Sequence, residues 1–248
     1  FITDNGYTIK QYNEFIYNLH APERNEYINT LREPGKPGSV KYKDRGSGIK
    51  TDDAIKYLKR NGVIYENGEA RAVASKAKIL LKAYNELHKP IINDTIKLYE
   101  DNGLVDQENL ADWKSRYKYY VPLAGFAADT LAKGSEPSSS GTGSVSKAFS
   151  VSGSEVKQAK GRISKADFAL EQTLARASAA VIRSEKNIIV KKLADLAREF
   201  PNDDVWQVRG KNKFMAAKPQ WDGEKAIISF KEDGKEKVVI LKDERLAR

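Results

Sequence analysis

The sequence predicts a mainly α protein, with helical bundle-like regions and a small antiparallel β-hairpin or sheet near the C-terminus. Apolar residues make up 40% of the 248 residues, enough for a folded core. Apolar side chains recur at helical spacing along most of the chain, and short apolar runs typical of strands follow near its end. Residues 133–155 are rich in Gly and Ser and predict a flexible linker between a helical region, 1–132, and a second region, 156–248.

The first helix is expected from Ile9 to about Arg32, with Thr8 as its N-cap. Pro22 removes a backbone donor, so we expect a kink or a restart there. A second helix is expected to begin with Thr51 as its cap and to end at Asn61–Gly62.

A longer helical region is expected from about Glu69 to Asp101, kinked or split at Pro90. A further helix follows from about Asp106 to Tyr117. The segment 119–123 should then be extended, because it contains a proline.

The second region begins with a long helix, which we expect to run from a cap at Ser164 to about Phe200. Its middle, residues 175–180, is rich in small side chains that let a partner helix approach closely. Strands are expected at 205–208, 226–230 and 237–241, the last two joined by a turn at Asp233–Gly234. Across the whole chain, the side chains predicted to be largely buried are Tyr12, Phe15, Leu19, Leu80, Leu87, Leu174, Val181, Leu193 and Leu196.

Few residues suggest chemistry. Cysteine is absent, which excludes disulfides, thiolate metal sites and cysteine nucleophiles. His20 has Glu23 one turn away, a spacing that suits a metal ligand pair but more often gives an ordinary helix contact. Gly46-Ser47-Gly48 before a helix suits either phosphate binding or a plain loop, and Asp52 and Asp53 would repel a phosphate. The sequence therefore predicts no catalytic residue, cofactor or metal.

Aromatic and basic side chains gather at the end of the expected 106–117 helix: Trp113, Arg116, Tyr117, Tyr119 and Tyr120. Bases of a nucleic acid can stack on such a cluster. The alternative is that it anchors the extended segment to neighbouring helices. No apolar run approaches the length of a membrane span.

The net charge of +9 lies mainly in the second part of the chain. Residues 133–248 hold 23 Lys and Arg against 16 Asp and Glu, and residues 1–132 hold 20 against 18. A basic region can attract nucleic acid, although scattered lysines on solvated faces are the alternative. The candidate nucleic-acid contacts are Arg183, Lys186, Lys191, Lys192, Lys211 and Lys213.

Several strings, taken in order, resemble motifs of the large polyvalent proteins of tailed phages, including those with a PLxRFG motif. The strings span residues 20–25, 46–52, 120–126, 161–164 and 185–190. Their motif residues are His20, Glu23, Arg24, Asn25, Gly46, Ser47, Gly48, Tyr120, Pro122, Leu123, Phe126, Gly161, Arg162, Glu185 and Asn187. Where the family has Arg-Phe-Gly, this chain has Gly125-Phe126-Ala127, so no role of that arginine is carried over. Glu23, Arg24 and Asn25 also fit a buried polar network on one helix.

The resemblance implies an internal module of a very long virion protein, packaged in the capsid with the genome and ejected into the host cell. Such a module is expected to be non-enzymatic and to contact other segments of its parent or other virion proteins. The alternatives are a module that binds DNA without sequence preference and an enzyme whose active site matches no familiar motif. The first residue, Phe1, and a last segment that looks like the start of a helix also suggest a fragment of a longer chain.

Overall fold

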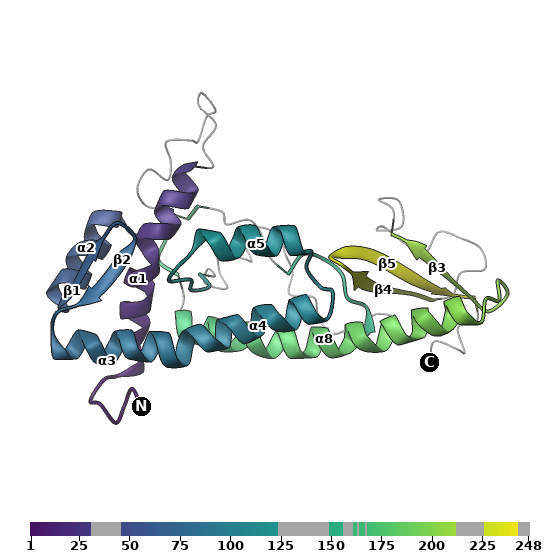
Figure 1. Ribbon diagram of the computed structural model, residues 1–248, viewed down its shortest axis with the longest axis horizontal. Coiled ribbons are helices and arrows are strands. Elements are labelled where there is room, and N and C mark those ends of the chain that lie inside the picture. Colours follow the sequence, from purple (N-terminus) through teal and green to yellow (C-terminus); the bar gives the residue numbers. More distant parts are fainter. Residues whose placement is uncertain are drawn as a thin grey trace. The chain divides into compact units, whose positions relative to one another are not determined.

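The computed structural model describes residues 1–30, 46–123, 149–155, 161–162, 164–166, 168–211 and 226–242. Within this part the chain is mainly α with a small antiparallel sheet near its C-terminal end, as predicted (Figure 1). The chain forms two compact units. Unit 1 comprises Phe1–Asp94, Ala111–Pro137 and Gln158–Ala177, and unit 2 comprises Thr95–Leu110, Ser138–Lys157 and Ser178–Arg248. Each unit thus draws on residues from both sides of the predicted linker, most of which lies outside the described residues.

Helix α1 spans Ile9–Thr30 and begins with a capping box. The Gln11 amide donates to the Thr8 hydroxyl at 3.1 Å, and the Thr8 amide donates to the Gln11 side-chain oxygen at 2.8 Å. The predicted cap is therefore confirmed. The helix runs through Pro22 without the restart that was considered.

Helix α2, Thr51–Arg60, is followed by a hairpin of β1, Val63–Glu66, and β2, Glu69–Ala72. The prediction of a helix from Glu69 was therefore wrong. The sequence signal for the hairpin is Asn67-Gly68, whose φ angles of 51° and 75° suit a tight two-residue turn. The prediction that Thr51 caps α2 was also wrong, because Thr51 is already helical and Lys50 is the N-cap.

The helix before Pro90 widens instead of breaking. Helix α3, Ser75–Ala83, passes into a π-helical turn, Tyr84–His88, and then into α4, Lys89–Asp101. The Lys89 amide donates to the Tyr84 carbonyl five residues earlier. A π turn is a known way to change the helical hydrogen-bond ladder locally, here directly before a residue that lacks an amide hydrogen.

Helix α5 spans Gln107–Arg116 and is capped by Asp106, whose carboxylate accepts the Asn109 amide at 2.8 Å. Helix α8 spans Ala169–Glu199, so Ser164 does not cap it as predicted. Instead the Leu170 amide in its first turn donates to the side-chain oxygen of Asn13 on α1, at 2.8 Å. A cap contributed by a distant residue leaves no local sequence signal.

In unit 2, strands β3, Trp206–Gly210, β4, Ala226–Glu232, and β5, Lys235–Leu241, form an antiparallel sheet in the order β3-β5-β4. Its inner face packs on α8, where Val190 and Ala194 meet Phe230 and Val239. The predicted hairpin at Asp233–Gly234 is confirmed.

Unit 1 has a separate core, in which Tyr12, Phe15 and Leu19 of α1 and Leu80 of α3 are buried as predicted. Leu193 is half-buried beside the core of unit 2. Four side chains expected in the core are instead exposed: Leu87, Leu174, Val181 and Leu196. In α8 the buried side carries small and polar residues, among them Ala180, Ser184 and Ala194, and most of the large apolar residues lie elsewhere. No described helix is long and apolar enough to span a membrane.

Candidate functional site

The second half of α1 buries polar side chains that an exposed helix would keep in water. His20, Glu23, Arg24 and Asn25 are each less than a tenth exposed. A buried polar group destabilises the fold unless it is hydrogen-bonded, so these four residues need partners from other segments. We call these residues, with the segments around Ser47, Tyr119 and Arg162 that contact them, the polar motif cluster.

Asn25 holds the loop that leads into α2. Its side-chain oxygen accepts the Ser47 amide at 2.6 Å, and its amide nitrogen donates to the Ile49 carbonyl and to the Thr51 hydroxyl, each at 3.0 Å. The Tyr17 hydroxyl donates to the Ser47 carbonyl at 2.7 Å. The hydroxyl of Thr51, expected to cap α2, is thus used by Asn25 instead.

The two glycines of this loop allow close packing of backbone. A Cβ on Gly46 would lie 2.6 Å from the Ile28 side chain. Gly48 has a φ of +101°, and a Cβ there would lie 2.2 Å from the Ser164 carbonyl. The Arg162 amide donates to the Gly46 carbonyl at 3.0 Å. The Gly-Ser-Gly string therefore serves contact between chain segments.

Glu23 anchors the segment after α5. Its two carboxylate oxygens accept the amides of Lys118 and Tyr119, each at 3.0 Å. These two bonds resemble those of a carboxylate that caps a helix, because each oxygen accepts one backbone amide. Hence this carboxylate joins α1 to residues 118–119.

His20 is fully buried between aromatic rings. The rings of Tyr117 and Tyr120 lie edge-on to it at 5.1 and 5.5 Å, and its Nδ1 lies 3.9 Å from the Glu23 carboxylate. Burial lowers the pKa of His20, and Glu23 only partly opposes that shift, so the imidazole is neutral at pH 7. No group of three or more His, Asp or Glu side chains that could hold a metal occurs among the residues with described positions.

Arg24 brings a charge into the same buried region. Burial lowers the pKa of its guanidinium, and the hydroxyls of Tyr117 and Tyr120 oppose this shift. The positive charge of the Arg162 guanidinium lowers the pKa of Arg24 further.

Two members of the predicted aromatic-basic cluster have structural contacts. Trp113 packs edge-on against Tyr120 at 4.5 Å, and Arg116 lies over the Tyr27 ring.

The remaining motif residues lie elsewhere. Pro122 and Leu123 are buried after the cluster, and Gly161 is half-buried beside it. Phe126 lies outside the described residues. Asn187 is in unit 2 and is buried, whereas Glu185 is exposed on the same helix.

Asn187 performs in unit 2 the task that Asn25 performs in unit 1. Its side-chain oxygen accepts the Lys231 amide at 2.8 Å, and its amide donates to the carbonyls of Lys231 at 2.9 Å and Asn102 at 2.8 Å. Lys231 belongs to β4, an edge strand of the sheet. Nearby the Val151 amide donates to the Ser229 carbonyl at 2.7 Å. Asn187 and Val151 together form hydrogen bonds with backbone groups of β4 that an edge strand would otherwise leave without a partner.

The candidate nucleic-acid contacts separate into two kinds. Arg183 donates to the Glu155 carboxylate at 2.9 Å, and Lys211 pairs with Glu236 at 2.8 Å, so both charges are used within unit 2. Lys192 is exposed, and Lys186 and Lys191 are half-buried. Lys213 lies outside the described residues. The five candidates within the described residues do not form one basic stripe.

A pocket of about 560 Å³ lies in unit 1 between α1 and α2. Its charged lining mixes Glu14 and Asp53 with Lys50, Lys56, Arg60 and Lys165. Lys165 pairs with Glu14 at 3.4 Å. The lining thus carries four basic side chains against two acidic ones, and one of each is engaged in this ion pair.

Comparisons with protein-family models, curated proteins and solved structures gave no match. The role of the chain must therefore be inferred from its own geometry and from the motif resemblance. Sequence reasoning missed three residues that hold distant segments: Tyr17 and Asn13 in unit 1, and Lys231 in unit 2. Each acts on a segment distant in the sequence, so no local pattern marks it.

Proposed function

We propose that this chain is a non-enzymatic structural and interaction module of a large tailed-phage virion protein, packaged with the genome and ejected with it. The proposed structural role rests on the hydrogen bonds that the motif side chains make. Glu23, Asn25 and Asn187 all place their polar atoms on backbone groups of distant segments. Such contacts fix how a chain folds and leave these atoms engaged within the protein.

The virion context is supported by the ordered motifs alone. On that basis the partners are other segments of the parent protein or other virion proteins. The site of action is the capsid interior and, after ejection, the host cell.

The test is the composition of purified particles of the phage whose genome encodes the chain. Mass spectrometry should find peptides of the chain in gradient-purified virions and lose them from the empty shells left after triggered ejection. A major capsid protein, which stays with the shell, is the control. Peptides found in infected cells but absent from particles would overturn the proposal.

A second candidate function is binding of DNA without sequence preference. It is favoured by the net charge of +7 on residues 133–248, from 23 basic and 16 acidic residues. The ion pairs of Arg183 and Lys211 weaken it, because those charges are already balanced. Its test is the salt dependence of binding to arbitrary duplex DNA.

A further inference from the structure

In unit 2, helix α8 buries small and polar residues on one side and exposes large apolar residues on the opposite side. Five large apolar side chains on the helix or just beyond its end are exposed by 43 to 58%: Val181, Ile182, Ile189, Leu196 and Phe200. At about 100° per residue they fall within an arc of roughly 100°. Ala180, Asn187 and Ala194, which are buried in unit 2, lie on the other side of the helix. We call the exposed arc the outer face of α8.

This outer face is large for a surface in water. From Val181 to Phe200 it extends about 30 Å at the rise of an α-helix. Extended exposed apolar faces rimmed or interrupted by charged residues mark interaction sites in folded proteins.

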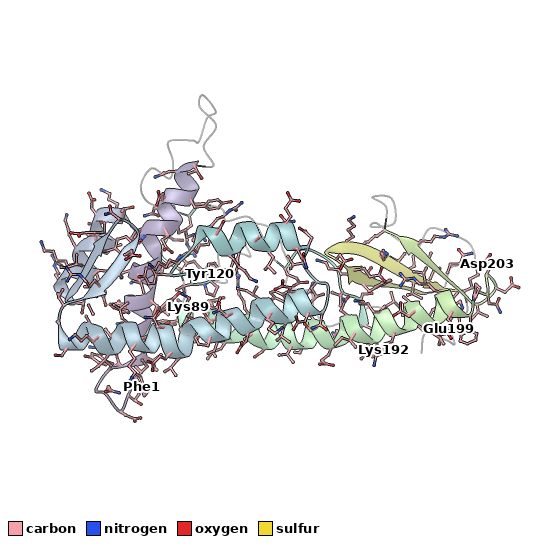
Figure 2. The ribbon with its side chains drawn as sticks, in the orientation of Figure 1. Phe1, Lys89, Tyr120, Lys192, Glu199 and Asp203 are labelled. Carbon is pink, nitrogen blue, oxygen red and sulfur yellow. The ribbon has the colours of Figure 1, made fainter. Side chains whose placement is uncertain are left out.

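Three charged residues, Glu185, Lys192 and Glu199, lie within the outer face, and the positions of the first two are self-complementary. Glu185 and Lys192 are both exposed and lie two helical turns apart. The midpoint between them falls between Ile188 and Ile189, and the same midpoint relates Val181 to Leu196. Lys192 is labelled in Figure 2 on the stretch of α8 that follows this midpoint.

We propose that two copies of this chain associate through the outer face of α8, antiparallel, about a two-fold axis between Ile188 and Ile189. Each Glu185 then faces Lys192 of the partner subunit, and each Val181 packs against Leu196 of the partner subunit. An isologous two-fold interface requires this kind of self-complementary pattern. The inference names a partner for the interaction role proposed above and rests on it to that extent.

The charges select the antiparallel arrangement. Two parallel helices in register would place Glu185 beside Glu185 and Lys192 beside Lys192, which is repulsive. Parallel helices shifted by two turns would pair the charges but leave an interface that does not close. The antiparallel pair satisfies both charges and closes as a dimer.

Charge exchange tests the proposal. Sedimentation velocity over a range of concentrations should show the full chain as a dimer that dissociates on dilution. Glu185→Lys and Lys192→Glu should each weaken the dimer by about tenfold or more, because each puts like charges opposite one another. The double variant should restore the affinity of the unaltered chain. Both changed positions are exposed, so the circular dichroism of all three variants should match that of the unaltered chain.

A cysteine scan tests the direction of the helices, since the chain has no cysteine of its own. Ile189→Cys should form an intersubunit disulfide on oxidation, because its two copies lie near the axis. Val181→Cys should not, because its two copies would be about 22 Å apart along the helices, beyond the reach of a disulfide. Crosslinking of both variants would show a parallel pair and overturn the arrangement.

An unaltered chain that remains a monomer at every concentration would overturn the dimer. If neither single charge variant weakens the dimer, the proposed interface is overturned. The same holds if the double variant does not restore the affinity. Neither result would decide whether the chain is a virion component, because that is measured on the particles.

Discussion

At the scale of single residues, the motif side chains of Glu23, Asn25 and Asn187 act as internal hydrogen-bonding partners. Asn25 satisfies the Ser47 amide, the Ile49 carbonyl and the Thr51 hydroxyl at the start of α2. An amide side chain suits this task because it donates and accepts at once. The sequence pointed to Asn25 through a polar network on α1, but the loop it binds could be known only from the fold.

Replacing Asn25 by alanine should therefore destabilise unit 1. The change leaves the Ser47 amide without its acceptor and removes the Asn25 donor from the Ile49 carbonyl, which keeps only the Ser47 hydroxyl. The expected cost is roughly 2–4 kcal/mol in the free energy of unfolding. Urea denaturation measures this cost. Asn5→Ala is the matched control, since Asn5 is exposed and its change should stay within about 0.5 kcal/mol. Equal effects of the two changes would contradict the structural role of Asn25.

His88 predicts a pH dependence of stability. It is buried, its Nε2 lies 3.1 Å from the Thr173 hydroxyl, and its ring stacks on Tyr84. Burial lowers its pKa from 6.5 to about 4. Between these values the unfolded chain binds a proton that the folded chain does not, so stability is full above pH 6.5 and falls as the pH drops towards 4. The contribution lost is roughly 3 kcal/mol.

The measurement is the free energy of unfolding across this pH range, for the unaltered chain and for His88→Gln. Glutamine keeps a hydrogen-bonding group beside Thr173 but does not titrate, so the variant should lose less stability on acidification. Some dependence should remain, because burial also lowers the pKa of His20. Identical curves for the two proteins would show that His88 does not titrate as stated.

At the scale of elements, local signals in the sequence located most ends of helices and strands. The Thr8 capping box, the Asp106 cap and the Asp233–Gly234 turn all depend on neighbours within four residues. Asn67-Gly68 carried the same kind of signal, and the hairpin it forms was overlooked in favour of helical spacing. The cap of α8 was not predictable, because Asn13 reaches it from α1.

The two sides of α8 show the limit of helical periodicity. Large apolar residues predicted its buried side, yet Val181 and Leu196 are exposed, and Ala180 and Ala194 are buried. Small side chains let the neighbouring elements approach the helix closely, and this close packing decides which side is inside. Periodicity finds an apolar stripe but does not say which of two stripes faces the core of the same chain.

A larger side chain on the small-residue side should accordingly be costly. Ala194→Leu would overpack the contact of α8 with the sheet around Phe230 and should destabilise unit 2 by about 1–3 kcal/mol. Ala179→Leu on the same helix is the control, because Ala179 is exposed and should tolerate the change within about 0.5 kcal/mol. Chemical denaturation followed by circular dichroism measures both. An Ala194→Leu chain as stable as the unaltered one would place that side of α8 outside the core.

At the scale of the whole molecule, charge is the property that bears on partners. The chain carries +9, and the described candidate nucleic-acid contacts other than the ion-paired Arg183 and Lys211 are Lys186, Lys191 and Lys192. Contacts of lysines with phosphates give binding without base readout. If the second candidate function holds, the full chain should bind duplex DNA weakly and lose affinity steeply with salt.

The double variant Lys186→Ala/Lys191→Ala should then lower the slope of log affinity against log salt by about 2, since each lost phosphate contact removes close to one unit. Lys10→Ala/Lys78→Ala changes the net charge equally at two exposed sites in unit 1 and is the control. Fluorescence anisotropy with an arbitrary duplex measures both. No binding of the unaltered chain at low salt would remove DNA as a partner.

The mainly α class, most helix ends, the C-terminal hairpin and the expected polar network on α1 could all be predicted from the amino-acid order. They depend on period, caps and turns, which act between residues close in the chain. The meeting of residues near 25, 47, 119 and 162 in one cluster, and the burial of the small residues of α8, became known from the fold. Both depend on which distant segments pack together. That choice is made by the summed fit of many weak contacts, and no short stretch of sequence contains it.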